Sequence, residues 1–250
     1  MVEQLIKHKE YAMSRKQPDV PVKREVRQKH KRDIDQALAP KTQVQSEYIN
    51  ALKTNSVVVC TGPAGTGKTF CAAAYAAIEL HHGNIEKIIV TRPNVGTGKS
   101  IGFFPGTIEE KMAPWCAPIT SVIKKILGEG EYECHIKHKN IETVPLEVIR
   151  GSSWDDAIVL VDESQNLTAE ELKMMSTRIG KHCTLVLMGD VTQADCPGAA
   201  FGFTNPLDDF ISLIERYDIP GADIVEFDID DVVRSDICGH FVRAYYKEGL

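Results

Sequence analysis

A short glycine-rich run with one lysine and one threonine is the strongest chemical signal in this sequence. It reads Gly62-Pro63-Ala64-Gly65-Thr66-Gly67-Lys68-Thr69, directly after an apolar stretch and directly before an alanine-rich stretch that favours a helix. Glycines let the backbone turn tightly and approach a ligand without a Cβ. At the start of a helix, such a turn directs several backbone N–H groups at a bound anion. The run therefore predicts a loop that binds a polyphosphate.

The residues of this loop have separate expected roles. Lys68 should contact the β- and γ-phosphates of a nucleotide, and the Thr69 hydroxyl should bind Mg2+. The candidate nucleotide-binding residues are Gly62, Pro63, Ala64, Gly65, Thr66, Gly67, Lys68, Thr69 and Phe70.

Two adjacent carboxylates follow a second apolar strand, Ala157 to Val161. We expect Asp162 to hold Mg2+ and Glu163 to orient and deprotonate the water that attacks the γ-phosphoryl group. The alternative is an acidic strand end or a helix cap. Because Thr168 and Glu171 already form a capping box for the next helix, the catalytic interpretation is favoured.

A third strand, Thr184 to Met188, leads through Gly189 and Asp190 to Gln193. A polar amide just beyond the end of a strand is well placed to sense the γ-phosphate, so we take Gln193 as the candidate sensor. Asp190 could pair with water on Mg2+, hold Gln193, or simply cap a turn.

The pattern around these motifs alternates short strands with longer helices. The expected strands are apolar on both faces, as in a parallel sheet covered by helices. They are Val57 to Cys60, Ile88 to Thr91, Ala157 to Val161, Thr184 to Met188 and Ile224 to Phe227, and the expected helices are Gln45 to Leu52, Lys68 to His81, Ile108 to Leu127, Ala169 to Ile179, Leu207 to Tyr217 and Asp231 to Tyr246. This predicts an α/β fold with a mostly parallel, doubly wound sheet flanked by helices. The stretch Gly128 to Val148 is expected to be a short hairpin or inserted loop outside the sheet.

Charge separates the beginning of the chain from the remainder. The chain of 250 residues has a net charge of −6, yet residues 1–41 carry a net +5 and the other residues a net −11. We expect a basic N-terminal extension over 1–40 and one domain over 41–250. The extension could touch phosphates or an acidic neighbour, or be a solvated tail. With no long apolar stretch and no secretory segment, the expected location is the cytoplasm, where the seven cysteines would be reduced.

The motifs together resemble the PhoH-like family, the phosphate-starvation-associated P-loop ATPases related to the superfamily 1 helicase core. The resemblance covers roughly Pro40 to Tyr246. Besides the glycine-rich loop, the blocks that carry it are Pro40-Lys41-Thr42, Thr91-Arg92-Pro93, Gly102-Phe103-Phe104-Pro105-Gly106, Arg150-Gly151, Asp162-Glu163-Ser164-Gln165-Asn166, Thr177-Arg178-Ile179-Gly180, Gly189-Asp190-Val191-Thr192-Gln193 and Asp231-Val232-Val233-Arg234. The resemblance implies a single RecA-like P-loop NTPase domain.

The resemblance also implies roles for residues outside the central motifs. Gln45 resembles the glutamine that reads the adenine edge, which would favour ATP over GTP. Arg234 looks like the late arginine that neutralises the γ-phosphate, with Arg92 and Arg178 as weaker candidates. A superfamily 1 helicase closes its site with a second lobe, for which this chain has no room. The resemblance therefore implies a ring-like homo-oligomer, most simply a hexamer, with ATP at the subunit boundary.

Two functions remain open. The first is an ATP hydrolase that requires Mg2+ and couples hydrolysis to binding, translocation on, or remodelling of single-stranded nucleic acid, with RNA favoured over DNA. The loop from Arg92 to Gly106 could contact such a strand through Lys99, Phe103 and Phe104, or could serve packing. The second is a nucleotide-gated assembly factor that controls a protein partner such as a ribonuclease. Cys134, His135 and His138 could suggest a metal site, but four suitably spaced ligands are lacking.

Overall fold

The computed structural model describes residues 34–93, 108–149, 154–191 and 205–248. The chain divides into two units, Met1–Gln36 and Ala37–Leu250, and every element named below belongs to the second. In chain order the elements are α3 (Gln43–Thr54), β1 (Val57–Thr61), α4 (Lys68–His82), β2 (Lys87–Thr91), α5 (Ile108–Leu127), α6 (Glu129–Lys137), β3 (Ile141–Thr143), α7 (Leu146–Ile149), β4 (Ala157–Val161), the 3-10 helix η2 (Ser164–Asn166), α8 (Ala169–Ser176), β5 (Thr184–Gly189), α9 (Pro206–Tyr217), β6 (Ala222–Glu226), the 3-10 helix η5 (Ile229–Asp231) and α10 (Asp236–Glu248).

The strands of the described residues form one six-stranded sheet in the order β3-β2-β4-β5-β1-β6. Every neighbouring pair is parallel, and Cys60 of β1, for example, pairs with Met188 of β5 and Val225 of β6. Because the strands are parallel, their carboxyl ends lie at one edge of the sheet. The glycine-rich loop after β1, the carboxylates after β4 and Asp190 after β5 therefore reach the same edge. This confirms the predicted fold class.

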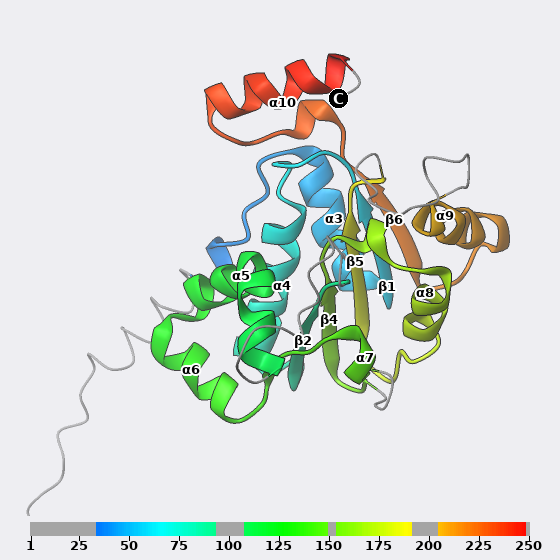
Figure 1. Ribbon diagram of the computed structural model, residues 1–250. Helices are drawn as coiled ribbons and strands as arrows, with labels where there is room; N and C mark the ends of the chain where they lie inside the picture. The colour runs from blue at the N-terminus through cyan, green and yellow to red at the C-terminus, as the bar shows by residue number, and fades with distance from the viewer. Residues whose placement is uncertain (1–33, 94–107, 150–153, 192–204, 249–250) are drawn as a thin grey trace, which may run out of the picture. The chain divides into compact units, whose positions relative to one another are not determined.

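Helices cover both faces of this sheet, which is why its central strands are apolar on both sides. Figure 1 shows α3, α4, α5 and α6 on one face and α7, α8 and α9 on the other. Strand β4 is buried along its whole length, and β1 and β5 are buried except at their first residues. On the second face, alternate strand residues such as Val159 and Leu185 pack with Leu172 of α8 and Leu207 of α9.

Helix α4 lies deep in the structure because its sequence is rich in alanine. Small side chains let its backbone approach the sheet and α5 closely, and Ala72 to Ala74, Ala76 and Ala77 are completely buried. The helix begins at Lys68, directly after Gly67, and ends at His82, where Gly83 is the C-cap residue with a φ of 72°. The phosphate-binding loop is thus carried by two of the most buried elements of the domain, β1 and α4.

The expectation for Gly128 to Val148 was wrong. This stretch forms the nine-residue helix α6 and then β3, which pairs with β2 inside the central sheet. None of the α6 residues is buried, so no apolar stripe marks the helix in the sequence. Strand β3 has only three residues, too few for a pattern of alternating burial.

The expected helix from Asp231 to Tyr246 was also wrong at its beginning. A 3-10 helix ends at Asp231, and α10 begins only at Asp236. The capping box of Asp228 and Asp231 starts that 3-10 helix, and the helix ends because the backbone of Val232 is extended, at φ −67° and ψ 112°. Arg234 consequently lies on a connecting segment between helices and not on a helix surface.

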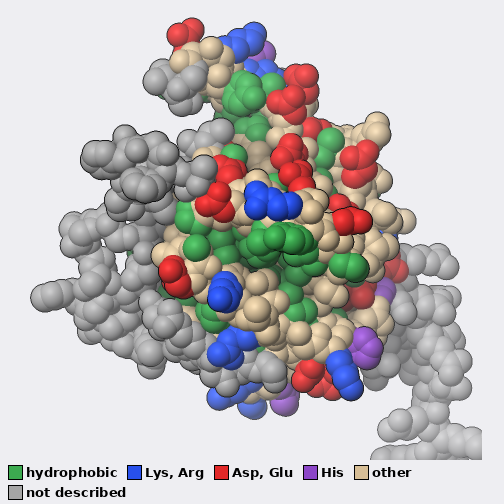
Figure 2. All heavy atoms as spheres, turned by 90° about the vertical axis from the view of Figure 1, so that its right-hand side faces the viewer, with side chains coloured by type: hydrophobic (Ala, Val, Ile, Leu, Met, Phe, Trp, Pro, Cys, Tyr) green, Lys and Arg blue, Asp and Glu red, His purple; other side chains and the backbone are tan. Residues whose placement is uncertain are grey.

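Figure 2 views the face covered by α8 and α9, where apolar side chains gather near the middle with carboxylates beside them. Leu207, Ile211 and Ile214 hold α9 to the core, while Leu213 and Tyr217 point outward and are exposed. The outer face of α9 is therefore mixed in character. Of the helices in the described ranges, none has both the length and the apolar content that crossing a bilayer requires.

Candidate functional site

The glycine-rich loop between β1 and α4 has a backbone that only glycine accommodates easily. Gly65 and Gly67 have φ angles of 91° and 96°, in the left-handed region that side chains disfavour. A Cβ on Gly65 would lie 2.8 Å from Cδ of Arg234, and one on Gly67 would lie 2.7 Å from Nε2 of Gln45. Arg234 and Gln45 thus pack closely against the loop. The loop leads directly into the N-terminus of α4, where backbone N–H groups and the helix dipole favour an anion.

Gln45, on α3, supports the loop from behind. Its Nε2 donates a hydrogen bond to the Thr66 carbonyl at 2.8 Å, and its Oε1 accepts one from the Lys41 N–H at 2.8 Å. The side chain is only 4% exposed. Pairing with an adenine edge would require the amide to exchange at least one of these bonds, so the adenine role of Gln45 stays a prediction.

Lys68, the first residue of α4, lies within the loop. Its ammonium donates hydrogen bonds to the carbonyls of Gly62 and Pro63, the latter at 2.8 Å. Burial lowers the pKa of Lys68, and the nearby Cys60, Asp190, Asp162 and Glu163 oppose that shift. The lysine therefore combines partial desolvation with a position beside the loop, which suits it to a phosphate.

Thr69 and Asp162 come from different elements and meet in the site. The Thr69 hydroxyl donates to Oδ1 of Asp162 at 3.4 Å. Burial raises the pKa of the Asp162 carboxyl, Glu163 raises it further, and Arg92 opposes this. A hydroxyl and a buried carboxylate are the oxygen ligands that Mg2+ prefers, and a cation would offset the desolvation of Asp162. The residues present fit a Mg2+ ion.

Glu163 is held by contacts from two sides. Its backbone has a φ of 54°, unusual for a residue other than glycine. Oε2 accepts a hydrogen bond from the Gln165 side-chain amide at 2.6 Å, and Oε1 lies 3.5 Å from Nη2 of Arg92. The Arg92 guanidinium in turn lies over the Trp115 ring, 5.8 Å from its centroid. The carboxylate is therefore anchored and still about one-third exposed.

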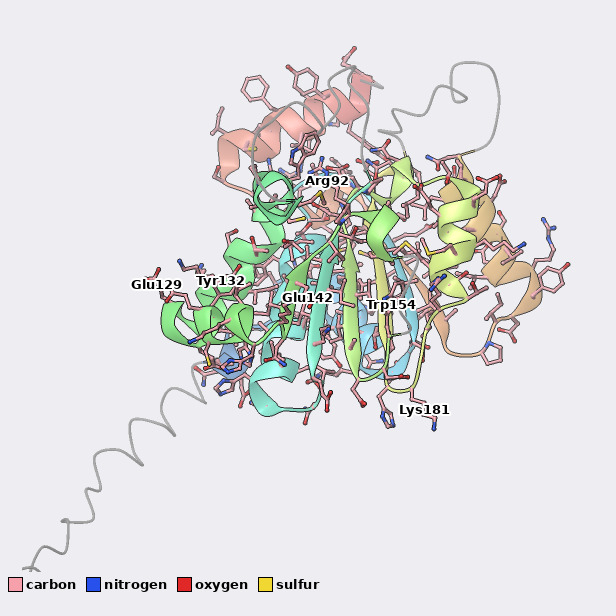
Figure 3. The ribbon with its side chains drawn as sticks, turned by 60° about the horizontal axis from the view of Figure 1, so that its bottom comes forward. Arg92, Glu129, Tyr132, Glu142, Trp154 and Lys181 are labelled. Carbon is pink, nitrogen blue, oxygen red and sulfur yellow. The ribbon has the colours of Figure 1, made fainter. Side chains whose placement is uncertain are left out.

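Arg234 lies against the glycine-rich loop of its own chain. Its side chain is beside Gly65, and the neighbouring Val233 N–H donates to the Gly65 carbonyl at 3.1 Å. Figure 3 shows Arg92 at the carboxyl edge of the sheet and Lys181 at the opposite edge. Arg178 follows α8 near the latter edge, beside Ile179, which forms a bridge with Trp154 ahead of β4. Of the arginines in the described ranges, Arg92 and Arg234 line the pocket, and Arg178 does not.

These groups surround one pocket of about 320 Å3. Its lining combines loop backbone, cations and carboxylates: Ala64, Gly65, Gly67, Lys68, Thr69, Phe70, Arg92, Pro118, Asp162, Glu163, Gly189, Asp190 and Arg234. Motifs that lie far apart in the chain therefore meet in one place.

Gln193 and the candidate strand-contacting residues Lys99, Phe103 and Phe104 lie outside the described residues. Sγ of Cys134 lies 3.5 Å from Nδ1 of His138, the residue that caps the C-terminus of α6. No metal-binding group of three or more His, Cys, Asp or Glu side chains is found in the described part of the chain.

Two contacts of the site were missed from the sequence. One is the pair of Arg92 with Glu163, and the other is the bond of Gln165 to Glu163. The sequence did offer one indication of the role of Gln165. Its side-chain amide lies two residues after the candidate base Glu163, within a block on which the family resemblance rests.

The fold and the site define a P-loop nucleotide-binding domain: a glycine-rich turn between a strand and a helix, a lysine and threonine at the helix start, and a carboxylate pair from a non-adjacent parallel strand. Residues 37–246 match the family model described as PhoH-like protein, and the chain belongs to this family. The resemblance inferred from the motifs is thereby confirmed.

Three curated relatives illustrate the similarity. The PhoH-like protein of Bacillus subtilis (strain 168) is 39% identical over 209 residues, which cover 83% of this chain and 64% of the relative. Protein PhoH of Escherichia coli (strain K12) is 37% identical over 216 residues, 86% of this chain and 59% of the relative. The PhoH-like protein of Mycobacterium tuberculosis (strain ATCC 25618 / H37Rv) is 38% identical over 210 residues, 84% and 58%. The chain thus spans about three-fifths of the length of these relatives.

Among solved structures, the large terminase of a thermophilic bacteriophage, in complex with ADP, aligns with a TM-score of 0.44 and 12% identity, over 88% of this chain and 49% of the terminase chain.

Proposed function

We propose that this chain is an ATPase that requires Mg2+ and hydrolyses ATP to ADP and phosphate. The observation that carries the proposal is the meeting of the Thr69 hydroxyl and the Asp162 carboxylate, 3.4 Å apart, in the pocket that Lys68 and Glu163 also line. These four groups provide a phosphate contact, a set of Mg2+ ligands and a base for water, which are the parts that phosphoryl transfer to water needs.

In the proposed reaction, a water oxygen bonds to the γ-phosphorus while the bond from that phosphorus to the bridging oxygen breaks. Glu163 accepts the proton that the water loses, and ADP leaves with the bridging oxygen. Lys68 and the loop N–H groups hold the phosphates, and Arg234 adds guanidinium donors beside Gly65. Mg2+, bound by Thr69 and Asp162, would neutralise part of the phosphate charge.

The preference for ATP over GTP is a further part of the proposal. Phe70, 37% exposed, lines the pocket and offers an aromatic face for a base. Gln45 lies behind the loop with its amide bonded to the loop backbone. If nucleotide binding broke the bonds of this amide to the Thr66 carbonyl and the Lys41 N–H, its Nε2 and Oε1 would be available to pair with the adenine edge.

We further propose that hydrolysis is coupled to binding, translocation on or remodelling of single-stranded RNA. The resemblance to the superfamily 1 helicase core supports this, as does the net +5 charge of residues 1–41. The test is the steady-state ATPase rate with and without an unstructured RNA of about 20 nucleotides, with a DNA strand and an RNA duplex of equal length as controls.

The expected result is stimulation by the single-stranded RNA that falls as salt rises, since phosphate contacts release counterions. If RNA neither raises the rate nor binds in a salt-sensitive manner, coupling to nucleic acid is wrong. The alternative, control of a protein partner such as a ribonuclease, would then be favoured.

We also propose that the protein assembles as a ring-like homo-oligomer, with a hexamer favoured. Helix α10 begins two residues after Arg234 and exposes an apolar row at intervals of four residues, Ile237, Phe241 and Tyr245. The rings of Phe241 and Tyr245 stack with centroids 6.3 Å apart. An exposed apolar row so close in sequence to the pocket residue Arg234 supports the proposal that α10 contacts a second copy of the chain.

Sedimentation in the presence of Mg2+ and ATP tests this assembly. Wild type should sediment as an oligomer, and Phe241→Asp should shift it toward monomer because a carboxylate would be buried in the contact. Ile136→Asp, on the exposed face of α6, makes the same chemical change at a 42% exposed side chain and should leave the sedimentation unchanged. A wild type that stays monomeric under these conditions would contradict the proposal.

A further inference from the structure

Gln165 is a buried amide that joins two parts of the pocket. It lies in η2, the short helix after β4, and is only 1% exposed. Its Nε2 donates to Oε2 of Glu163 at 2.6 Å, and its Oε1 accepts from the backbone N–H of Asp190 at 3.1 Å. Both ends of the amide are thus committed, one to the proposed base and one to the end of β5.

The end of β5 is shaped to receive this amide. A Cβ on Gly189 would lie 2.6 Å from Oε1 of Gln165 and 3.0 Å from its backbone nitrogen. A side chain at position 189 would therefore displace Gln165. This close contact, together with burial, leaves the Gln165 amide a narrow range of positions, and a constrained donor is suited to orienting another group.

Glu163 needs such support because its own backbone does not provide it. Its φ of 54° is a strained conformation that persists only where surrounding contacts hold it. Arg92 contacts the other carboxylate oxygen at 3.5 Å, a longer approach than the 2.6 Å bond from Gln165. The bond from Gln165 is therefore the shorter and more directional of the two restraints.

We propose that Gln165 is a positioning residue for hydrolysis, which acts by fixing the Glu163 carboxylate relative to the end of β5. This inference rests on the proposed ATPase function. Its consequence is that the Glu163 carboxylate and the backbone of Asp190, directly after β5, keep a fixed position relative to each other. A displacement of the carboxylate by about 1 Å can reduce a rate by about a hundredfold, so a residue that fixes it can matter as much as a direct contact.

A double-mutant cycle tests this inference. Gln165→Ala and the nearly isosteric Gln165→Met should each reduce kcat by about 10- to 100-fold with little change in KM, because the loss affects water activation and not ATP binding. In the Glu163→Gln background, single-turnover hydrolysis of radiolabelled ATP should show no further loss from either change. Non-additivity of this kind indicates that two residues act through the same step.

Thr168→Ala is the structural control. It removes the capping box of α8, just after η2, in which the Thr168 hydroxyl bonds Glu171. It should lower stability by about 1 kcal/mol while kcat stays near the wild-type value. If Gln165→Met keeps the wild-type kcat, raises KM instead, or loses activity additively with Glu163→Gln, the positioning role is wrong. A wild type that binds ATP without hydrolysing it would instead contradict the proposed function itself.

Discussion

Glu163→Gln should bind ATP as wild type does and hydrolyse it about 100 to 10,000 times more slowly. The amide nearly preserves the shape of the side chain, and the contact of Oε2 with Gln165 can be retained by the amide oxygen. The amide cannot accept a proton from water, and a positioned base contributes about that factor to a rate. ATP affinity measured by equilibrium dialysis, together with phosphate release, separates binding from hydrolysis.

Glu142→Gln is a matched control for this variant. Glu142, on β3, also pairs with a cation, with Oε2 lying 3.4 Å from the Lys87 ammonium, and its side chain is 29% exposed against 36% for Glu163. It does not line the pocket. Turnover should be unchanged in Glu142→Gln. Wild-type turnover in Glu163→Gln would remove Glu163 as the group that activates water.

The parts of the site that the sequence predicted are those encoded by contiguous residues. The loop from Gly62 to Thr69 contains its own turn, helix start and cation, so its geometry follows from local chemistry. Asp162 and Glu163 follow a run of residues that is apolar on both faces. Such a run is typical of a buried strand in a parallel sheet, so the two carboxylates are expected directly after the end of that strand. Parallel strands then bring both motifs to one edge without any knowledge of the contacts between them.

The parts that could not be predicted depend on contacts between distant residues. Gln165 could be recognised as polar, but its bond to the Asp190 N–H depends on how β4 and β5 align and on the absence of a side chain at Gly189. The position of Arg234 beside Gly65 depends on a break before α10 that apolar periodicity does not mark. The edge strand β3 was missed because three residues are too few to show a period.

Lys68→Ala is expected to have the largest effect on nucleotide binding. Each charge-assisted hydrogen bond contributes about 1.5 to 3 kcal/mol, and contacts to two phosphates would together correspond to a loss of affinity of about a hundredfold or more. Isothermal titration calorimetry with ATP and Mg2+ would measure this loss of affinity. Lys87→Ala, which removes a lysine at the amino end of β2 that pairs with Glu142, should leave ATP affinity unchanged.

Lys68 contributes to the structure of the loop as well as to phosphate binding, and the two contributions have to be measured separately. Its ammonium bonds the carbonyls of Gly62 and Pro63, so its removal also frees the loop that binds the phosphates. Lys68→Arg keeps the charge and the loop contacts but places a larger, planar group in a half-buried position shaped for an ammonium. If phosphate contact dominates, Lys68→Arg should recover part of the affinity that Lys68→Ala loses, while thermal unfolding of both variants stays close to that of wild type. If Lys68→Ala binds ATP as tightly as wild type, the loop cannot be the phosphate site, and the assignment of this pocket fails with it.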